Sequence, residues 1–82
     1  MILHAFGIAR EIIGGATLDL ASADATPLPS TVGELDAHLR ARFPQLTEIG
    51  TVRYAVNQAF AAAEARIGPK DELAIIPPVS GG

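Results

Sequence analysis

The stretch TVGELDAHLRARFP, residues 31–44, decides the fold of this chain because it carries the clearest helical pattern. Thr31 and Glu34 match a capping box, in which the threonine side chain accepts a free backbone N–H and the glutamate reaches back to the start of the helix. Apolar residues then recur at spacings of three, four and four, which places them on one stripe. The stripe consists of Val32, Leu35, Leu39 and Phe43. We therefore predict an amphipathic helix that is closed by Pro44 and packs one face against another layer.

The opposite side of this predicted helix is polar. It carries Asp36, His38, Arg40 and Arg42, and we interpret it as a solvated surface. Neither His38 nor His4 stands at a convincing metal-ligand spacing from other histidines or carboxylates. We expect His4 to be half-buried on a strand and His38 to lie on the helix surface. The sequence therefore predicts no metal site and no cofactor-binding site.

Strands are predicted on both sides of the helix from runs of alternating or continuous apolar residues. They cover residues 1–6, 16–20, 53–57, a short stretch around Phe60, and 73–76. A short helical turn over residues 8–13 precedes the second strand, and Asn57 with Gln58 begins a turn. The alanines of residues 59–66 favour helix, but the segment is short and lies between strands, so we assign a brief strand and a connection. This order predicts an α+β fold, a β-grasp mixed sheet of about four to five strands with one main helix packed on one face.

Length, composition and charge exclude several classes of protein. A chain of 82 residues forms one small domain. It contains no cysteine, so disulfides, thiolate nucleophiles and cysteine metal sites are excluded. The net charge is −3 and the six basic residues are scattered, which argues against a nucleic-acid partner. No apolar run approaches the roughly 18 residues that span a membrane, and no signal peptide is visible. We expect a cytoplasmic protein with no membrane partner.

The chain ends in PPVSGG, residues 77–82, and this tail is the main candidate for function. Pro77 and Pro78 stop the last strand because proline lacks the backbone donor that a sheet requires, and they favour an extended exit. Gly81 and Gly82 have no side chain, so the terminal carboxylate can enter a narrow channel. That carboxylate is an inert anion near neutrality and needs activation. We divide the chain into a β-grasp domain, residues 1–76, and an extended diglycine tail, residues 77–82.

A partner surface is predicted beside the base of the tail. Phe6, Phe60 and Ile76 are apolar residues on strands whose other face already supplies the core. We expect them to converge on the sheet face that the helix leaves open and to bind a protein partner. The alternative is a minor buried cluster under the connection formed by residues 59–69.

Four features of the sequence resemble the MoaD family of ubiquitin-like sulfur carriers, the small subunits of molybdopterin synthases. They are Arg10 and Glu11 after an apolar first strand, residues 55–58 with the sequence AVNQ, Asp71 and Glu72 at the start of the last strand, and the terminal PPVSGG. The resemblance covers nearly the whole chain, and the terminal motif is its specific part. Two departures are a first strand one residue short of the family pattern and Gly7, where a bulkier residue or alanine is expected. They concern the register of the first strand and leave the tail unaffected.

The resemblance implies a function that the chain performs with partners. In this family an adenylating, ubiquitin-activating-like enzyme uses ATP to activate the terminal glycine, which becomes a thiocarboxylate. Gly82 would carry the reactive atom, and the tail formed by Pro77, Pro78, Val79, Ser80 and Gly81 would deliver it. The partner is the large subunit of the synthase, in which sulfur passes to cyclic pyranopterin monophosphate. The chain is expected to bind no cofactor, to be non-catalytic alone, and to act in a hetero-oligomer.

Three alternatives remain open on the sequence. A carrier for thiamine, cysteine or tRNA thiolation uses the same fold and the same diglycine end. A ubiquitin-like modifier would form isopeptide bonds with the same activated carboxylate. A plain interaction domain would use no tail chemistry, and deletion of Gly81 and Gly82 would leave its function intact.

Overall fold

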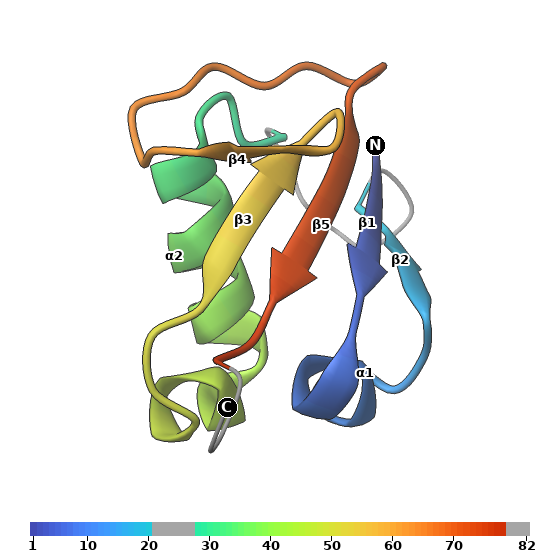
Figure 1. Cartoon of the computed structure of the whole chain (residues 1–82), viewed down its shortest axis with the longest axis vertical. Helices are drawn as coiled ribbons and strands as arrows, with labels where there is room; N and C mark the ends of the chain where they lie inside the picture. The colour runs from blue at the N-terminus through green and yellow to red at the C-terminus, as the bar shows by residue number, and fades with distance from the viewer. Residues whose placement is uncertain (21–27, 79–82) are drawn as a thin grey trace.

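The computed structural model describes residues 1–20 and 28–78, which form a mixed sheet with helix α2 packed on one face (Figure 1). In chain order the elements are β1 (Ile2–Ala5), α1 (Gly7–Ile13), β2 (Thr17–Asp19), α2 (Val32–Arg42), the 3-10 helix η1 (Pro44–Glu48), β3 (Arg53–Val56), β4 (Ala59–Ala61) and β5 (Glu72–Ile76). Within the described part of the chain the sheet has five strands in the order β2-β1-β5-β3-β4. The predicted β-grasp fold is confirmed.

The first and last strands lie side by side at the centre of the sheet. β1 and β5 run parallel, with Leu3 opposite Leu73 and Ala5 opposite Ile75. Alternate residues of both strands face α2, and Leu3, Leu73 and Ile75 have no more than 1% of their surface exposed. Because the two strands are parallel, the C-terminal end of β5 emerges beside the end of β1, next to α1 (Figure 1). The fold thus places the base of the tail at the C-terminal end of the two central strands.

The N-terminus of α2 is capped largely as predicted. The Thr31 hydroxyl oxygen accepts the Glu34 backbone N–H at 3.1 Å. The Glu34 carboxylate reaches one residue further back than a capping box requires, because Ser30 offers both its backbone N–H and its hydroxyl, each at 3.0 Å. These hydrogen bonds, the backbone one first, hold the pKa of Glu34 below its ordinary value.

The predicted stripe of α2 supplies much of the core. Val32, Leu35 and Leu39 are buried, whereas Phe43 ends the helix and is only partly buried. Leu46 of η1 is fully buried beneath the same layer and was not predicted. The chain turns from α2 into η1 at Phe43, whose N–H donates to the Leu39 carbonyl at 2.7 Å.

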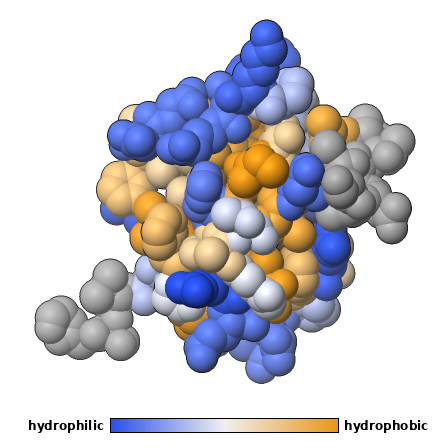
Figure 2. Space-filling model, turned by 90° about the vertical axis from the view of Figure 1, so that its right-hand side faces the viewer, coloured by the Kyte–Doolittle hydropathy of each residue, from blue (hydrophilic) through white to orange (hydrophobic). Residues whose placement is uncertain are grey.

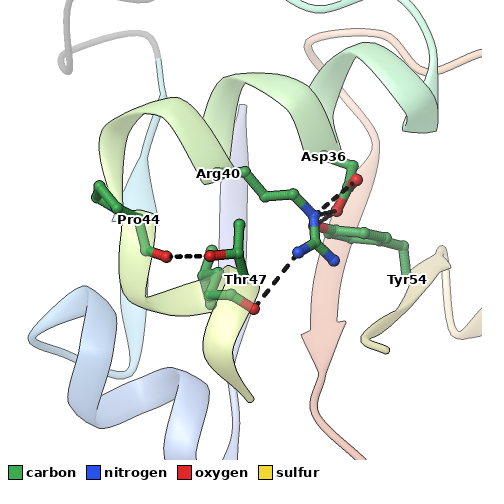
Figure 3. A network of polar contacts seen from close by, with 6 residues as sticks. Asp36, Arg40, Pro44, Thr47 and Tyr54 are labelled. Atoms are coloured by element: carbon green, nitrogen blue, oxygen red, sulfur yellow. Dashed lines mark hydrogen bonds and ion pairs between the residues drawn. The ribbon is translucent and has the colours of Figure 1, made fainter. Parts of the chain in front are cut away.

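The interpretation of the polar side of α2 as a plain solvated surface is wrong for three of its residues, Asp36, Arg40 and His38. The hydroxyl of Tyr54 on β3 donates to Oδ1 of Asp36 at 2.6 Å, and Nε of Arg40 donates to both Asp36 oxygens at 3.0 Å (Figure 3). Arg40 also reaches the Leu46 carbonyl at 3.4 Å. Tyr54 is buried, so this polar contact ties the helix to the sheet at the edge of the core. His38 is half-buried rather than on the surface, and its Nε2 lacks a hydrogen-bond partner among the described residues.

The hairpin between β3 and β4 confirms the assignment of residues 57–61. Asn57 and Gln58 both have positive φ, 52° and 71°, as a two-residue turn between antiparallel strands requires. Ala55 then pairs with Phe60 across the hairpin.

Among residues 1–20 and 28–78, no helix combines the length and apolarity needed to cross a membrane.

Candidate functional site: the tail base and the open face of the sheet

The reactive end of the tail lies outside the described residues. Val79, Ser80, Gly81 and Gly82 therefore keep only the roles predicted from sequence. The described structure ends with Pro77, half-buried, and Pro78, exposed. These two prolines, with Ile76 before them, form the base from which the tail leaves the sheet.

Two segments contact this base, the start of α1 and the chain after η1. Pro77 lies against Gly7 at the start of α1, where a Cβ added to the glycine would be 3.1 Å from Cγ of the proline ring. Pro78 lies against Gly50, which follows η1, and the corresponding distance there is 3.8 Å. An apolar hollow surrounds the prolines and is completed by Phe6, Ile8, Ile49 and Ile76. We call this the base hollow.

The three residues predicted to bind a partner lie together. Phe6, Phe60 and Ile76 line a groove of about 370 Å³ on the sheet face opposite α2. The groove is completed by His4, Ala55, Gln58, Glu72 and Ala74. Phe6 and Phe60 are 53% and 59% exposed, so the alternative of a buried cluster under residues 59–69 does not hold. The structure brings the residues together, and their role in binding remains a prediction.

The open groove and the base hollow are neighbours. They share Phe6 and Ile76, which contribute to both linings. A partner that covers the groove is therefore in contact with the base of the tail. Figure 2 shows orange and tan apolar surface between blue polar regions on one side of the molecule. Among residues 1–20 and 28–78, the exposed large apolar residues are Ile2, Phe6, Ile8 and Phe60.

Phe60 is held in place at the surface. The guanidinium carbon of Arg53 lies 4.0 Å from the centre of the Phe60 ring, a cation–π contact between adjacent strands. Such a contact is worth about 0.5–1 kcal/mol at an exposed site. Arg53 therefore favours one orientation of an exposed aromatic ring on the groove.

Several contributors to these surfaces were missed from the sequence. Gly50, Ile8 and Ile49 come from segments far from the tail in sequence, and Ala55 and Ala74 line the groove. The one available signal was the pair Phe6 and Gly7 at the end of a strand, which suggests a close backbone approach. No group of three or more histidine, aspartate or glutamate side chains within residues 1–20 and 28–78 is arranged to hold a metal ion.

Comparisons with known proteins agree on the type of domain. The model of the ThiS family matches residues 3–82. The molybdopterin synthase sulfur carrier subunit of Arabidopsis thaliana is 38% identical over 78 residues, covering 94% of this chain and 77% of the plant protein.

Solved structures show the same fold. Small archaeal modifier protein 1 of Haloferax volcanii superposes with a TM-score of 0.72 and 27% identity, covering 100% of this chain and 98% of that chain. Its counterpart in Methanosarcina acetivorans gives a TM-score of 0.75 at 23% identity, with 99% and 94% covered. A chain of the BexX/CysO complex of Amycolatopsis orientalis gives 0.69 at 20% identity, with 99% and 98% covered. At such identities the last two support the fold alone.

Proposed function

This chain belongs to the ThiS family of ubiquitin-like sulfur carriers, and from that premise we propose that it is the sulfur carrier subunit of a molybdopterin synthase. The observation that carries the proposal is the terminal Gly81–Gly82 pair, since the family match extends to the last residue of the chain. The 38% identical plant relative is named as such a subunit, which favours this pathway over other uses of the fold.

The proposed chemistry takes place at the Gly82 carboxyl group. One of its oxygens attacks the α-phosphorus of ATP on an adenylating enzyme, and pyrophosphate leaves. Hydrosulfide supplied by a separate donor then attacks the acyl carbon, and AMP leaves with the oxygen. The resulting thiocarboxylate is ionised at neutral pH and is more nucleophilic than a carboxylate. In the large subunit its sulfur forms a bond to a carbon of cyclic pyranopterin monophosphate as an oxygen substituent leaves, and water then cleaves the acyl–sulfur bond, which restores the Gly82 carboxylate. ATP is bound by the activating enzyme and not by this chain.

The described residues support delivery rather than catalysis. The prolines Pro77 and Pro78 limit the conformations open to the base of the tail, which reduces the ordering entropy lost when the tail is threaded. The groove formed around Phe6, Phe60 and Ile76 lies beside that base, so one partner can hold the domain and receive the tail together. We assign this groove to the large subunit of the synthase.

A second candidate function is protein modification. Small archaeal modifier protein 1 of Haloferax volcanii is 27% identical over the whole of this chain. A modifier would use the same adenylate, with a lysine amine in place of sulfur as the nucleophile, and would form an isopeptide bond as AMP leaves.

Intact-mass spectrometry tests the proposal. The chain is incubated with its adenylating enzyme, ATP and a sulfur donor, and we expect the fixed mass increase of an oxygen-to-sulfur exchange at the C-terminus. The matched variant lacks Gly82 and should show no increase while keeping its thermal stability. Stable high-mass conjugates on a denaturing gel would favour the modifier. Restoration of molybdopterin synthesis by the truncated chain would contradict the proposed role of the Gly82 carboxyl group.

A further inference from the structure

Gly7 and Pro77 occupy equivalent places at the ends of the two central strands. Ala5 of β1 lies opposite Ile75 of β5 in a parallel pair. Gly7 comes two positions after Ala5, and Pro77 comes two positions after Ile75. The chain at Gly7 turns into α1, whereas the chain at Pro77 leaves the sheet as the tail. The turn into α1 therefore sits against the first residue of the tail.

The contact between them leaves little room for a side chain. Gly7 has a φ of +55°, a left-handed conformation that side chains rarely adopt. A Cβ at this position would lie 3.1 Å from Cγ of Pro77, which is tighter than nine in ten such contacts. A side chain at residue 7 would therefore require the Pro77 ring, with which the tail begins, to move by a few tenths of an ångström.

The second proline also contacts the domain. Pro78 is in ordinary van der Waals contact with the position of a Cβ on Gly50, at 3.8 Å. Ile8 and Ile49 extend the apolar lining on either side of the prolines. The base is thus held between the start of α1 and the loop after η1.

We propose that Gly7 is a positioning residue that seats Pro77 and sets the direction in which the tail leaves the domain. The inference rests on the proposed function, since direction matters only if the C-terminal carboxylate must reach a partner's active site. Gly7 touches neither substrate nor the reacting atoms and acts only through Pro77.

Substitution of Gly7 can be separated from the general cost of a side chain at positive φ. Gly14 has a φ of +92° and nothing within 4 Å of an added Cβ, so Gly14→Ala carries the conformational cost without a proline contact. Gly7→Ala adds the contact. Gly7→Asn carries the same Cβ on a residue that tolerates left-handed backbone better, and it replaces the alanine variant if that one does not fold. The double variant Gly7→Ala with Pro77→Ala removes Cγ of Pro77, the atom that the added Cβ would approach.

The first measurement reports direction without any enzyme. A nitroxide label is attached to Ser80→Cys, which is unambiguous because the chain has no other cysteine. Relaxation enhancement of backbone amides in α1 and η1 then maps where the tail goes. We expect the pattern to change in Gly7→Ala, to stay as in the parent chain in Gly14→Ala, and to return toward it in the double variant. An unchanged pattern in folded Gly7→Ala or Gly7→Asn overturns the proposal.

The second measurement uses the unlabelled full chain with its adenylating enzyme. We expect kcat/KM for ATP–pyrophosphate exchange to fall at least tenfold in Gly7→Ala, to be unchanged in Gly14→Ala, and to recover in part in the double variant. A fall of equal size in both single variants means a structural effect alone and overturns the proposal. If the parent chain itself is not adenylated, the proposed function fails, while the label pattern still decides whether Gly7 directs the tail.

Discussion

The side-chain oxygen of Asn57 accepts the backbone N–H of Glu72 at 3.0 Å, while the Asn57 backbone N–H donates to the Glu72 carbonyl at 2.7 Å. The β3–β4 turn is thereby joined to the first residue of β5. The Asn57 side-chain nitrogen also donates to Oδ1 of Asp71 at 3.0 Å, and Oδ2 of Asp71 accepts the Gly68 N–H at 2.7 Å. Two sequence features that are far apart, AVNQ and Asp71–Glu72, are therefore parts of one hydrogen-bonded junction.

Loss of the Asn57 side chain should destabilise this junction. Asn57→Ala removes two hydrogen bonds and places alanine at positive φ, where asparagine is more easily accommodated. We expect a loss of about 1–2 kcal/mol in the free energy of unfolding, measured by urea denaturation. Gln58→Ala is the control, because Gln58 also has positive φ and no side-chain hydrogen bond is recorded for it within residues 1–20 and 28–78. Equal losses in the two variants would contradict the assigned role.

Acid stability should depend on Asp71. The hydrogen bond from the Asn57 side chain, followed by that from the Gly68 backbone, holds the pKa of Asp71 below its ordinary value of 3.8. A carboxyl group whose pKa is lowered on folding stabilises the fold above its unfolded pKa, and this contribution is lost as the pH falls below 3.8 toward the folded pKa.

A carboxyl-carbon NMR titration of Asp71 checks this directly. We expect a pKa below the ordinary aspartate value in the parent chain and a shift upward, toward that value, in Asn57→Ala. A pKa at or above the ordinary value in the parent chain would show that the hydrogen bonds do not persist in solution.

The contact between Tyr54 and Asp36 should be visible spectroscopically. Burial first, and then the hydrogen bond and charge of Asp36, raise the pKa of Tyr54 above its ordinary value of 10.0. A group whose pKa is raised on folding stabilises the fold in its protonated form. The contribution of the Tyr54 hydroxyl is therefore fully present below pH 10.0 and is lost as the pH rises toward the higher pKa of the folded state. Tyr54 is the single tyrosine and the chain has no tryptophan, so phenolate absorbance reports on it alone. We expect no phenolate to form near the ordinary pKa while the protein stays folded, and a normal titration would contradict the buried hydrogen bond.

The energetic value of the same contact can be isolated with a double-mutant cycle. Tyr54→Phe should cost about 1–2 kcal/mol in unfolding free energy, because the hydroxyl donates to a carboxylate at the edge of the core. Asp36→Ala removes the acceptor and also the ion pair with Arg40. We expect the double variant to be less destabilised than the sum of the single variants. Strict additivity would show that the two side chains do not interact.

The helices and strands could be predicted well from the sequence, because residues with strong local preferences stand at their ends. The cap at Thr31, the turn at Asn57–Gln58 and the stop at Pro77 depend on neighbours within a few residues, which sequence displays directly. The strand β4 was correctly preferred over helix because the turn forces Phe60 back beside Ala55. That pairing overrides the helix propensity of the alanines.

The unpredicted features depend on residues that are distant in sequence. Tyr54 and Asp36 are 18 positions apart, so nothing near either one indicates the hydrogen bond. Gly7 and Pro77 meet only because β1 and β5 are parallel neighbours, and the positive φ of Gly7 leaves no trace in composition. The alternation of residues along the strands was enough to predict the groove. The base hollow could not be predicted in this way, because its lining depends on where the chain after η1 lies.

The last prediction concerns the groove as a docking surface for the synthase large subunit. Phe60 is 59% exposed, so Phe60→Asp should leave the domain folded. It removes the apolar ring from the groove and places there a carboxylate that a partner must desolvate, and both changes oppose binding. We expect the affinity to fall more than tenfold, at least about 1.4 kcal/mol, in titration calorimetry with the purified subunit. The matched control is Ala16→Asp, which adds the same charge at an exposed site next to β2, the strand at the opposite edge of the sheet from β4. The affinity should change little in this control, because Ala16 does not line the groove. Both variants carry the same added charge, so the difference between them reports the local effect at Phe60. Equal weakening by both would assign the effect to net charge, and unchanged binding of Phe60→Asp would reject the groove as the docking surface.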